Sequence, residues 1–237
     1  MQTEQDLSMD VPRTVGQIVD ATVRCYWRHP LLFFTLALAV VGPYDLIVLA
    51  TTRATPLATG TASASTALAL SLVSLGVVAP FVSALHVHAV AAVGAGRRAR
   101  PADIGWRGLR VLPVVVAAQL AAAVGIGVGL LAFLVPGIFL ALRWQVVAQA
   151  AAIERTDWIG ALRRSNALTR GHMWHVLAVA LLSGLFSQLL RSTVSLALGS
   201  SRGLGQVLAA IAVDTFAQSV AALVGAILYF DLRARER

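Results

Sequence analysis

Four charged side chains stand inside long apolar stretches of the sequence: Asp45, Arg143, Arg191 and Asp214. A charge in the hydrocarbon of a membrane costs about 2.5 to 3.5 kcal/mol on insertion scales, so such residues usually pair, bind a substrate or conduct ions. Counted at the helical rise from the expected outer ends of the apolar stretches, all four lie in the outer half of the membrane. We predict that Arg143 pairs with Asp214 or Asp45, and that the group forms either a structural clamp or a substrate or ion site.

Glu154 is a second residue that could do chemistry, because it stands beside an apolar stretch and close to the basic residues Arg163 and Arg164. A general base needs a nucleophile or a substrate proton within reach, and no partner nucleophile is evident in the sequence. We therefore interpret Glu154 as part of a charge network at the membrane interface, and we expect no catalytic residues.

The histidines and the single cysteine do not predict a metal or cofactor site. His86 and His88 are two apart and point to different faces of a helix, whereas His172 and His175 share a face but have no recognisable third ligand. Cys25 alone permits neither an internal disulfide nor a cysteine-based zinc site. We expect the chain to hold no metal and no cofactor.

The composition places these residues in a membrane protein. Of the 237 residues, 58% are hydrophobic and 13% charged, with a mean hydropathy of +0.78, which excludes an ordinary soluble domain and a disordered chain. Because about 20 apolar residues cross the hydrocarbon core, the sequence predicts an all-α polytopic fold with six spans. We place them at residues 31–50, 64–93, 111–134, 135–153, 173–198 and 204–230, between a polar tail at 1–12 and a basic tail at 231–237.

Glycine and proline residues predict local features of these spans. The second span is long enough to cross once with a tilt or with a kink at Pro80. Pro136 and Gly137 are expected to form the tight turn between the third and the fourth span. Gly125 and Gly129 are four apart, which lets another helix approach closely, as small residues at this spacing do.

The arginines predict the topology. All 19 basic residues are Arg and the net charge is +8, yet with both termini in the cytoplasm only Arg53, Arg191 and Arg202 fall on the outer side. This distribution follows the positive-inside rule, and it predicts a multi-pass protein of the bacterial cytoplasmic membrane. Topology accounts for the basic charge, so nucleic acid is not needed as a partner.

Three segments on the cytoplasmic side, 13–28, 102–110 and 157–170, are amphipathic and are predicted to be short helices in the plane of the interface. Thr156 is the expected N-cap of the third, and Gly171 its expected stop. Basic amphipathic helices bind anionic headgroups, so we expect membrane lipids as partners and allow for a protein partner.

Several short motifs resemble a bacterial multi-pass family, the glycerophosphoryl diester phosphodiesterase membrane domain, and related six-span proteins. The clearest is Ala161-Leu162-Arg163-Arg164-Ser165 continuing to Gly171, which is similar to that family's Ala-Leu-x-x-Ser-x-x-Leu-x-x-Gly signature. The other matches are Thr14–Asp20, Val135–Ile138 with Arg143, and Glu154. Gln17 stands where the family often has an acidic residue, and the proline that often precedes the glutamate is missing, which predicts a straighter end of the fourth span.

The resemblance implies that phosphodiester hydrolysis belongs to a separate soluble barrel domain in fused members of the family. Such a barrel takes about 250 residues, and the longest predicted cytoplasmic stretch here is far shorter. The sequence therefore favours a non-enzymatic scaffold, partner-binding or regulatory subunit. The alternative is a transporter or lipid-handling protein that uses a buried polar layer around Arg143, Asp214 and Asp45.

Overall fold

The computed structural model describes residues 11–52, 63–154, 156–198 and 203–236, and in these residues the chain forms helices and no strand. Arg53, Arg155, Arg202 and most of the predicted polar tail lie outside the described residues. Six helical stretches are long and apolar enough to cross a membrane, which confirms the predicted all-α multi-pass class. The helices are α1 (Val15–Arg28), α2 (Pro30–Thr52), α3 (Ala64–Val73), the π-helical turn η2 (Ser74–Val78), α4 (Ala79–Gly94), α5 (Pro101–Ala132), α6 (Leu134–Arg143), α7 (Val147–Ile153), α8 (Trp158–Thr169), α9 (Met173–Leu198) and α10 (Leu204–Arg235).

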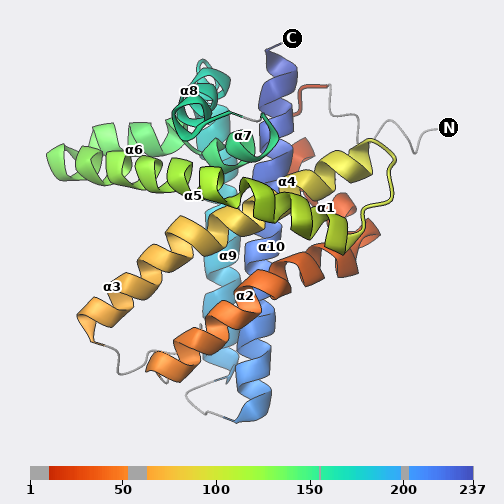
Figure 1. The fold of residues 1–237 in the computed structure, drawn as a ribbon, viewed down its shortest axis with the longest axis vertical. Coiled ribbons are helices and arrows are strands. Elements are labelled where there is room, and N and C mark those ends of the chain that lie inside the picture. The colour runs from red at the N-terminus through yellow and green to blue at the C-terminus, as the bar shows by residue number, and fades with distance from the viewer. Residues whose placement is uncertain (1–10, 53–62, 155, 199–202, 237) are drawn as a thin grey trace.

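The spans form helical hairpins whose tips diverge (Figure 1). In the view of Figure 1, α9 and α10 run side by side along the long axis, α5 and α6 extend to one side, and α2 and α3 extend below them. The surfaces that face outward on these hairpins are apolar, as at Leu131 near one tip and Leu185 on α9, which are 90% and 58% exposed. Large exposed apolar side chains on so many helices fit a hydrocarbon environment.

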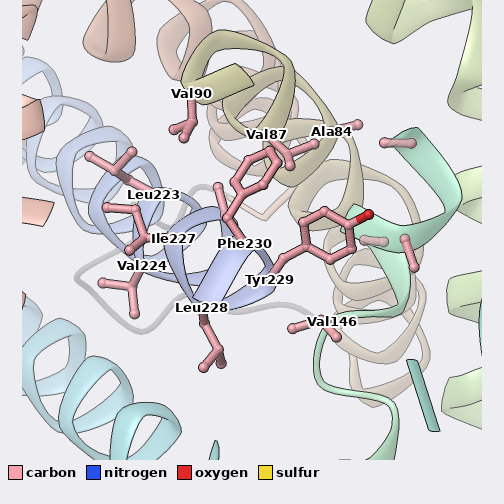
Figure 2. Close-up of a cluster of buried hydrophobic side chains, with 14 of the residues drawn as sticks. Ala84, Val87, Val90, Val146, Leu223, Val224, Ile227, Leu228, Tyr229 and Phe230 are labelled. Atoms are coloured by element: carbon pink, nitrogen blue, oxygen red, sulfur yellow. The ribbon is translucent and has the colours of Figure 1, made fainter. Parts of the chain in front are cut away.

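The hairpins meet around the C-terminal half of α10. Here α10 packs against α1, α4 and α9 and buries nearly every apolar side chain that it carries. Figure 2 shows Val87 and Val90 of α4 gathered with Ile227 and Phe230 of α10 in this cluster. The side chains of Leu228, Tyr229 and Leu232 are also almost wholly inaccessible. This cluster holds the polar networks described below in fixed positions.

The second span carries its irregularity directly before Pro80. The helix widens into the π-helical turn η2, and Pro80 then occupies the first turn of α4. A proline ring clashes with the carbonyl four residues earlier and cannot donate to it, and a wider turn relieves that clash. The predicted irregularity at Pro80 is therefore present, as a π-helical turn.

The predicted separate surface helix at 102–110 is wrong, because α5 is a single helix over Pro101–Ala132. No turn-forming residue separates the amphipathic segment from the apolar one. Pro113 lies inside the helix and removes one backbone hydrogen bond without ending it. The polar first turns of α5 and the apolar span thus belong to one continuous helix.

The turn between α5 and α6 also differs from the prediction. Phe133 is the one extended residue between the helices, with φ −160° and ψ 146°, so Pro136 and Gly137 lie inside the first turns of α6. The close approach predicted at the glycines is confirmed. A Cβ on Gly129 would lie 3.0 Å from the Cα of Gly137, and a Cβ on Gly125 would lie 2.5 Å from the Trp144 ring.

Candidate functional site

The inner end of the molecule, defined here as the end where α1, α8 and the C-terminus of α10 meet, is held together by Asp231. The Asp231 carboxylate is fully buried and accepts hydrogen bonds from Arg235 Nε at 2.9 Å and from His175 Nε2 at 3.0 Å. It also accepts from the backbone N–H of Arg13, while the Arg235 guanidinium donates to the Arg13 carbonyl. One carboxylate therefore joins the start of α1 to α9 and α10.

A second network at this end is centred on Glu154. The sequence analysis predicted that Glu154 takes part in a charge network with nearby arginines, and the structure places Arg164 beside it. The Glu154 carboxylate accepts from Arg164 Nε and from the Tyr229 hydroxyl, each at 2.8 Å. Arg164 also pairs with Glu236 at 2.7 Å. Burial opposes the charge of Arg164, but the two carboxylates outweigh it and raise the pKa of its guanidinium above the ordinary value. Arg164 therefore stays charged and links α8 to α10.

The signature residues on α8 form its buried face. Ala161 and Ser165 are fully buried, whereas Leu162 is half-buried and Arg163 is exposed. The Ser165 hydroxyl donates to the Arg143 carbonyl at 2.9 Å. The short side chains let α8 lie close against the end of α6, so these signature positions account for the docking of α8. Its N-cap is Asp157, which accepts from the Gly160 N–H at 2.8 Å, and not the predicted Thr156.

Gly171, the last signature residue, reverses the chain between α8 and α9. Its φ is +84°, a region that costs a residue with a Cβ about 1 to 2 kcal/mol. No atom lies within 4 Å of the position that a Cβ would occupy, so only the backbone would be strained. We expect Gly171→Ala to lower the stability by about 1 kcal/mol, and Gly171→Asn by less.

Thermal unfolding in detergent measures this effect. Gly16→Ala in α1 is the matched control, because Gly16 also has open space around it but has an ordinary helical backbone. An equal change in both variants would contradict the assigned role of Gly171.

Arg143 does not lie where the sequence placed it. The fourth span is interrupted: α6 ends at Arg143, and the span resumes as α7 at Val147. The break turns Arg143 toward α8, where its guanidinium donates to the Asn166 carbonyl at 3.2 Å and lies 4.8 Å from the centre of the Phe139 ring. The hypothesis that Arg143 pairs with Asp214 or Asp45 is wrong.

The other three charges of the predicted layer do come together. Arg191 on α9 pairs with Asp214 on α10 at 2.7 Å, and Asp45 on α2 lies within electrostatic range of both. Asp45 is 2% exposed, and its Oδ2 has no hydrogen-bond partner among the described residues. Gln218 Nε2 donates weakly to Asp214 at 3.4 Å. Arg191 therefore takes the role that the sequence analysis gave to Arg143.

A buried hydrogen-bonded pair, His86 and Ser219, was missed by the sequence analysis. His86 Nδ1 donates to the Val82 carbonyl at 2.8 Å, which leaves Nε2 as the acceptor facing the Ser219 hydroxyl at 2.9 Å. A serine beside a histidine has the chemistry of a nucleophile and its base. Both side chains are fully buried, however, so no substrate reaches them and the pair joins α4 to α10.

The single cysteine is equally inaccessible. Cys25 is fully buried, and this burial raises the pKa of its thiol to about 11, with Arg28 opposing the shift. Because the thiolate is the reactive form, Cys25 is inert at neutral pH. Among the described residues, no group of three His, Cys, Asp or Glu side chains could hold a metal ion.

Comparisons with protein families, curated proteins and solved structures give no match to this chain. Its class follows from its own fold, which is that of an all-α, multi-pass membrane protein. Charged side chains join its helices at two places, around Asp214 and around Asp231.

Proposed function

We propose that the chain is a non-enzymatic scaffold, partner-binding or regulatory subunit of the bacterial cytoplasmic membrane, with both termini in the cytoplasm. The observation that carries this proposal is the pairing at the inner end. Asp231 and Glu154, which have the chemistry of acids and bases, are engaged with Arg235, His175, Arg164 and Tyr229. Their role is therefore to fix α1, α8 and the end of α10 as one rigid surface.

The charge on this surface supports its orientation. Three arginines near this end are exposed: Arg163 on α8, Arg170 directly after it, and Arg107 on α5. Such residues favour the cytoplasmic side, where the membrane surface is anionic. The resemblance to the phosphodiesterase membrane-domain family belongs to the same proposal. It is supported by the roles of three residues of the motif: Ala161 and Ser165 are buried where α8 packs on its neighbours, and Gly171 reverses the chain after α8.

Site-specific photocrosslinking in native membranes tests the scaffold role. A photoreactive residue at Arg163 or Ala167, on the exposed face of α8, is expected to give one discrete protein adduct. The same residue at Leu185, which is exposed on α9, is the control and is expected to give lipid adducts only. Lipid adducts alone from the α8 positions would contradict the proposal.

A second candidate, a transporter or lipid-handling protein, is favoured by Asp45. A buried carboxyl with an unpartnered oxygen, beside Asp214 and Arg191, is what an ion or substrate site inside a membrane requires. Water access distinguishes the two functions. If a cysteine at position 45, in a Cys25→Ala background, reacts with a membrane-impermeant thiol reagent, transport is favoured. If it stays unreactive, the layer is a dry structural clamp.

A further inference from the structure

A pocket of about 340 Å³ opens where α1 passes into α2 and where α4 passes into the loop before α5. The basic side chains of its lining are His29, Arg97 and Arg98, and its apolar wall includes Leu32 and Val93. The lining contains no acidic residue. This volume is at the lower end of the range for small-molecule sites, about 300 to 1,000 Å³, and it suits a small anionic group.

The two arginines are positioned by the way α4 ends. Gly96 has φ +64°, and its N–H donates to the Val93 carbonyl at 3.0 Å. The Arg97 N–H donates to the Ala92 carbonyl, also at 3.0 Å, so both turns of this C-terminal cap are closed. The cap fixes the backbone from which both guanidinium groups extend. Neither Arg97 nor Arg98 forms an ion pair with another described residue, and their charge is available to a ligand.

The surroundings of the pocket place it at a membrane surface. Trp27 and Leu31, on either side of His29 in the chain, are 73% and 78% exposed. Tryptophan favours the headgroup layer, and an exposed leucine next to it favours the start of the acyl chains. A ligand in the pocket thus meets guanidinium groups at one end and apolar side chains at the other.

We propose that this pocket binds the headgroup of an anionic phospholipid, with the phosphate between Arg97, Arg98 and His29 and the glycerol end against Leu32 and Val93. Arginine matches phosphate oxygens in geometry as well as in charge. Zwitterionic lipids carry an ammonium group that the two guanidinium groups repel, so the pocket selects lipids with net negative charge. The proposal takes its side of the membrane from the proposed topology, but it does not depend on the scaffold role.

Lipid retention by the purified full-length chain tests the proposal. The protein is reconstituted in nanodiscs of phosphatidylcholine and phosphatidylglycerol, and native mass spectrometry then counts the lipids that stay bound. The double variant R97Q/R98Q is expected to retain phosphatidylglycerol at least about tenfold less than the unmodified chain. Circular dichroism and thermal unfolding check that it folds.

The matched control is R107Q/R110Q. Arg107 and Arg110 are exposed on the first turns of α5, and they do not line the pocket. This control removes the same charge and is expected to retain the lipid. An equal loss in both double variants would overturn the proposal, because it would show attraction to the surface and no specific site.

Inorganic phosphate distinguishes a lipid from a soluble ligand of the same chemistry. The delipidated protein in neutral detergent is titrated with inorganic phosphate and with short-chain phosphatidylglycerol, and the heat of binding is measured. Only the lipid is expected to bind, because the apolar wall contributes to affinity. Binding of inorganic phosphate with equal affinity and the same dependence on Arg97 and Arg98 would overturn the lipid assignment. Photocrosslinking from α8 tests the scaffold role, whereas lipid retention and titration test this pocket. Either proposal can therefore fail without the other.

Discussion

Asp231→Asn is expected to destabilise the protein by about 3 kcal/mol, because it removes the charge that three donors share at the inner end. The Asp231 carboxylate is fully buried, whereas Arg235 and His175 retain 22% and 15% of their side-chain exposure. Partial access to water places the cost near the lower end of the range for breaking a buried ion pair. In a chain of this length the loss corresponds to a melting temperature about 6 to 12 °C lower, measured by thermal unfolding in detergent.

Asp20→Asn is the matched control for this prediction. Asp20 pairs with Arg24 on the surface of α1, and both side chains are about half exposed, at 57% and 43%. Exposed pairs of this kind contribute about 0 to 1 kcal/mol, so the control is expected to unfold close to the unmodified chain. The assigned role of Asp231 would be wrong if the two variants unfolded at the same temperature.

The effect of Asp231→Asn can also be measured locally, at the start of α1. Because Asp231 accepts from the Arg13 backbone and Arg235 donates to the Arg13 carbonyl, the start of α1 depends on this site. Hydrogen exchange at the first turn of α1 is expected to increase more than exchange in the middle of α10. Uniform acceleration over the whole chain would indicate general destabilisation and no specific link.

The sequence predicts the spans well because their length has a simple physical cause. A helix needs about 20 apolar residues to cross the hydrocarbon, and this requirement is visible in composition alone. The Glu154 network was also predictable from the sequence. Charges are costly in hydrocarbon, so they cluster where an apolar stretch ends, and Glu154 stands there beside several arginines. The same logic predicts that Asp45, Arg191 and Asp214 share a layer, because each lies at a definite number of residues from the end of its span.

What the sequence does not predict is which charges in a layer meet. Arg143 was expected to pair in the membrane, but α6 ends at Arg143 and the chain turns it toward α8. No proline or glycine marks this break between Arg143 and Val147, so periodicity and turn signals do not detect it. The pair of His86 and Ser219 is missed for another reason. Its partners are 133 residues apart, and only the packing of α4 on α10 joins them.

The glycines show the same limit. Gly125 and Gly129 predict a close approach from spacing alone, but not the identity of the neighbour, which is Trp144 for one and Gly137 for the other. The direction of the α5 and α6 hairpin relative to α9 and α10 is likewise absent from local signals (Figure 1). It depends on the side chains that meet around α10, which are contributed by most of the chain.

The largest effect is expected from reversing a charge in the layer that Asp45, Arg191 and Asp214 form. Arg191→Asp places a third carboxyl beside Asp214 and Asp45, and Asp214→Arg places two guanidinium groups together. Either single variant leaves like charges side by side and Asp214 or its replacement unpaired at a buried position, where one unpaired charge costs about 3 to 5 kcal/mol. The partial exposure of position 191 lowers this cost for Arg191→Asp. We expect several-fold less protein in the membrane fraction for each. The double variant Arg191→Asp with Asp214→Arg restores the pair, and it is expected to recover most of the protein level and melting temperature.

The decisive comparison is with the pairing that the sequence first suggested. Arg143→Asp combined with Asp214→Arg is expected to show no rescue, because Arg143 contacts Asn166 and Phe139 and not Asp214. Contacting charges couple by about 0.5 to 3 kcal/mol in a double-mutant cycle, whereas distant charges add within about 0.5 kcal/mol. Coupling in the Arg191 cycle and additivity in the Arg143 cycle would assign the clamp to α9 and α10. The opposite result would place Arg143 in the layer and contradict the pairing of Arg191 with Asp214.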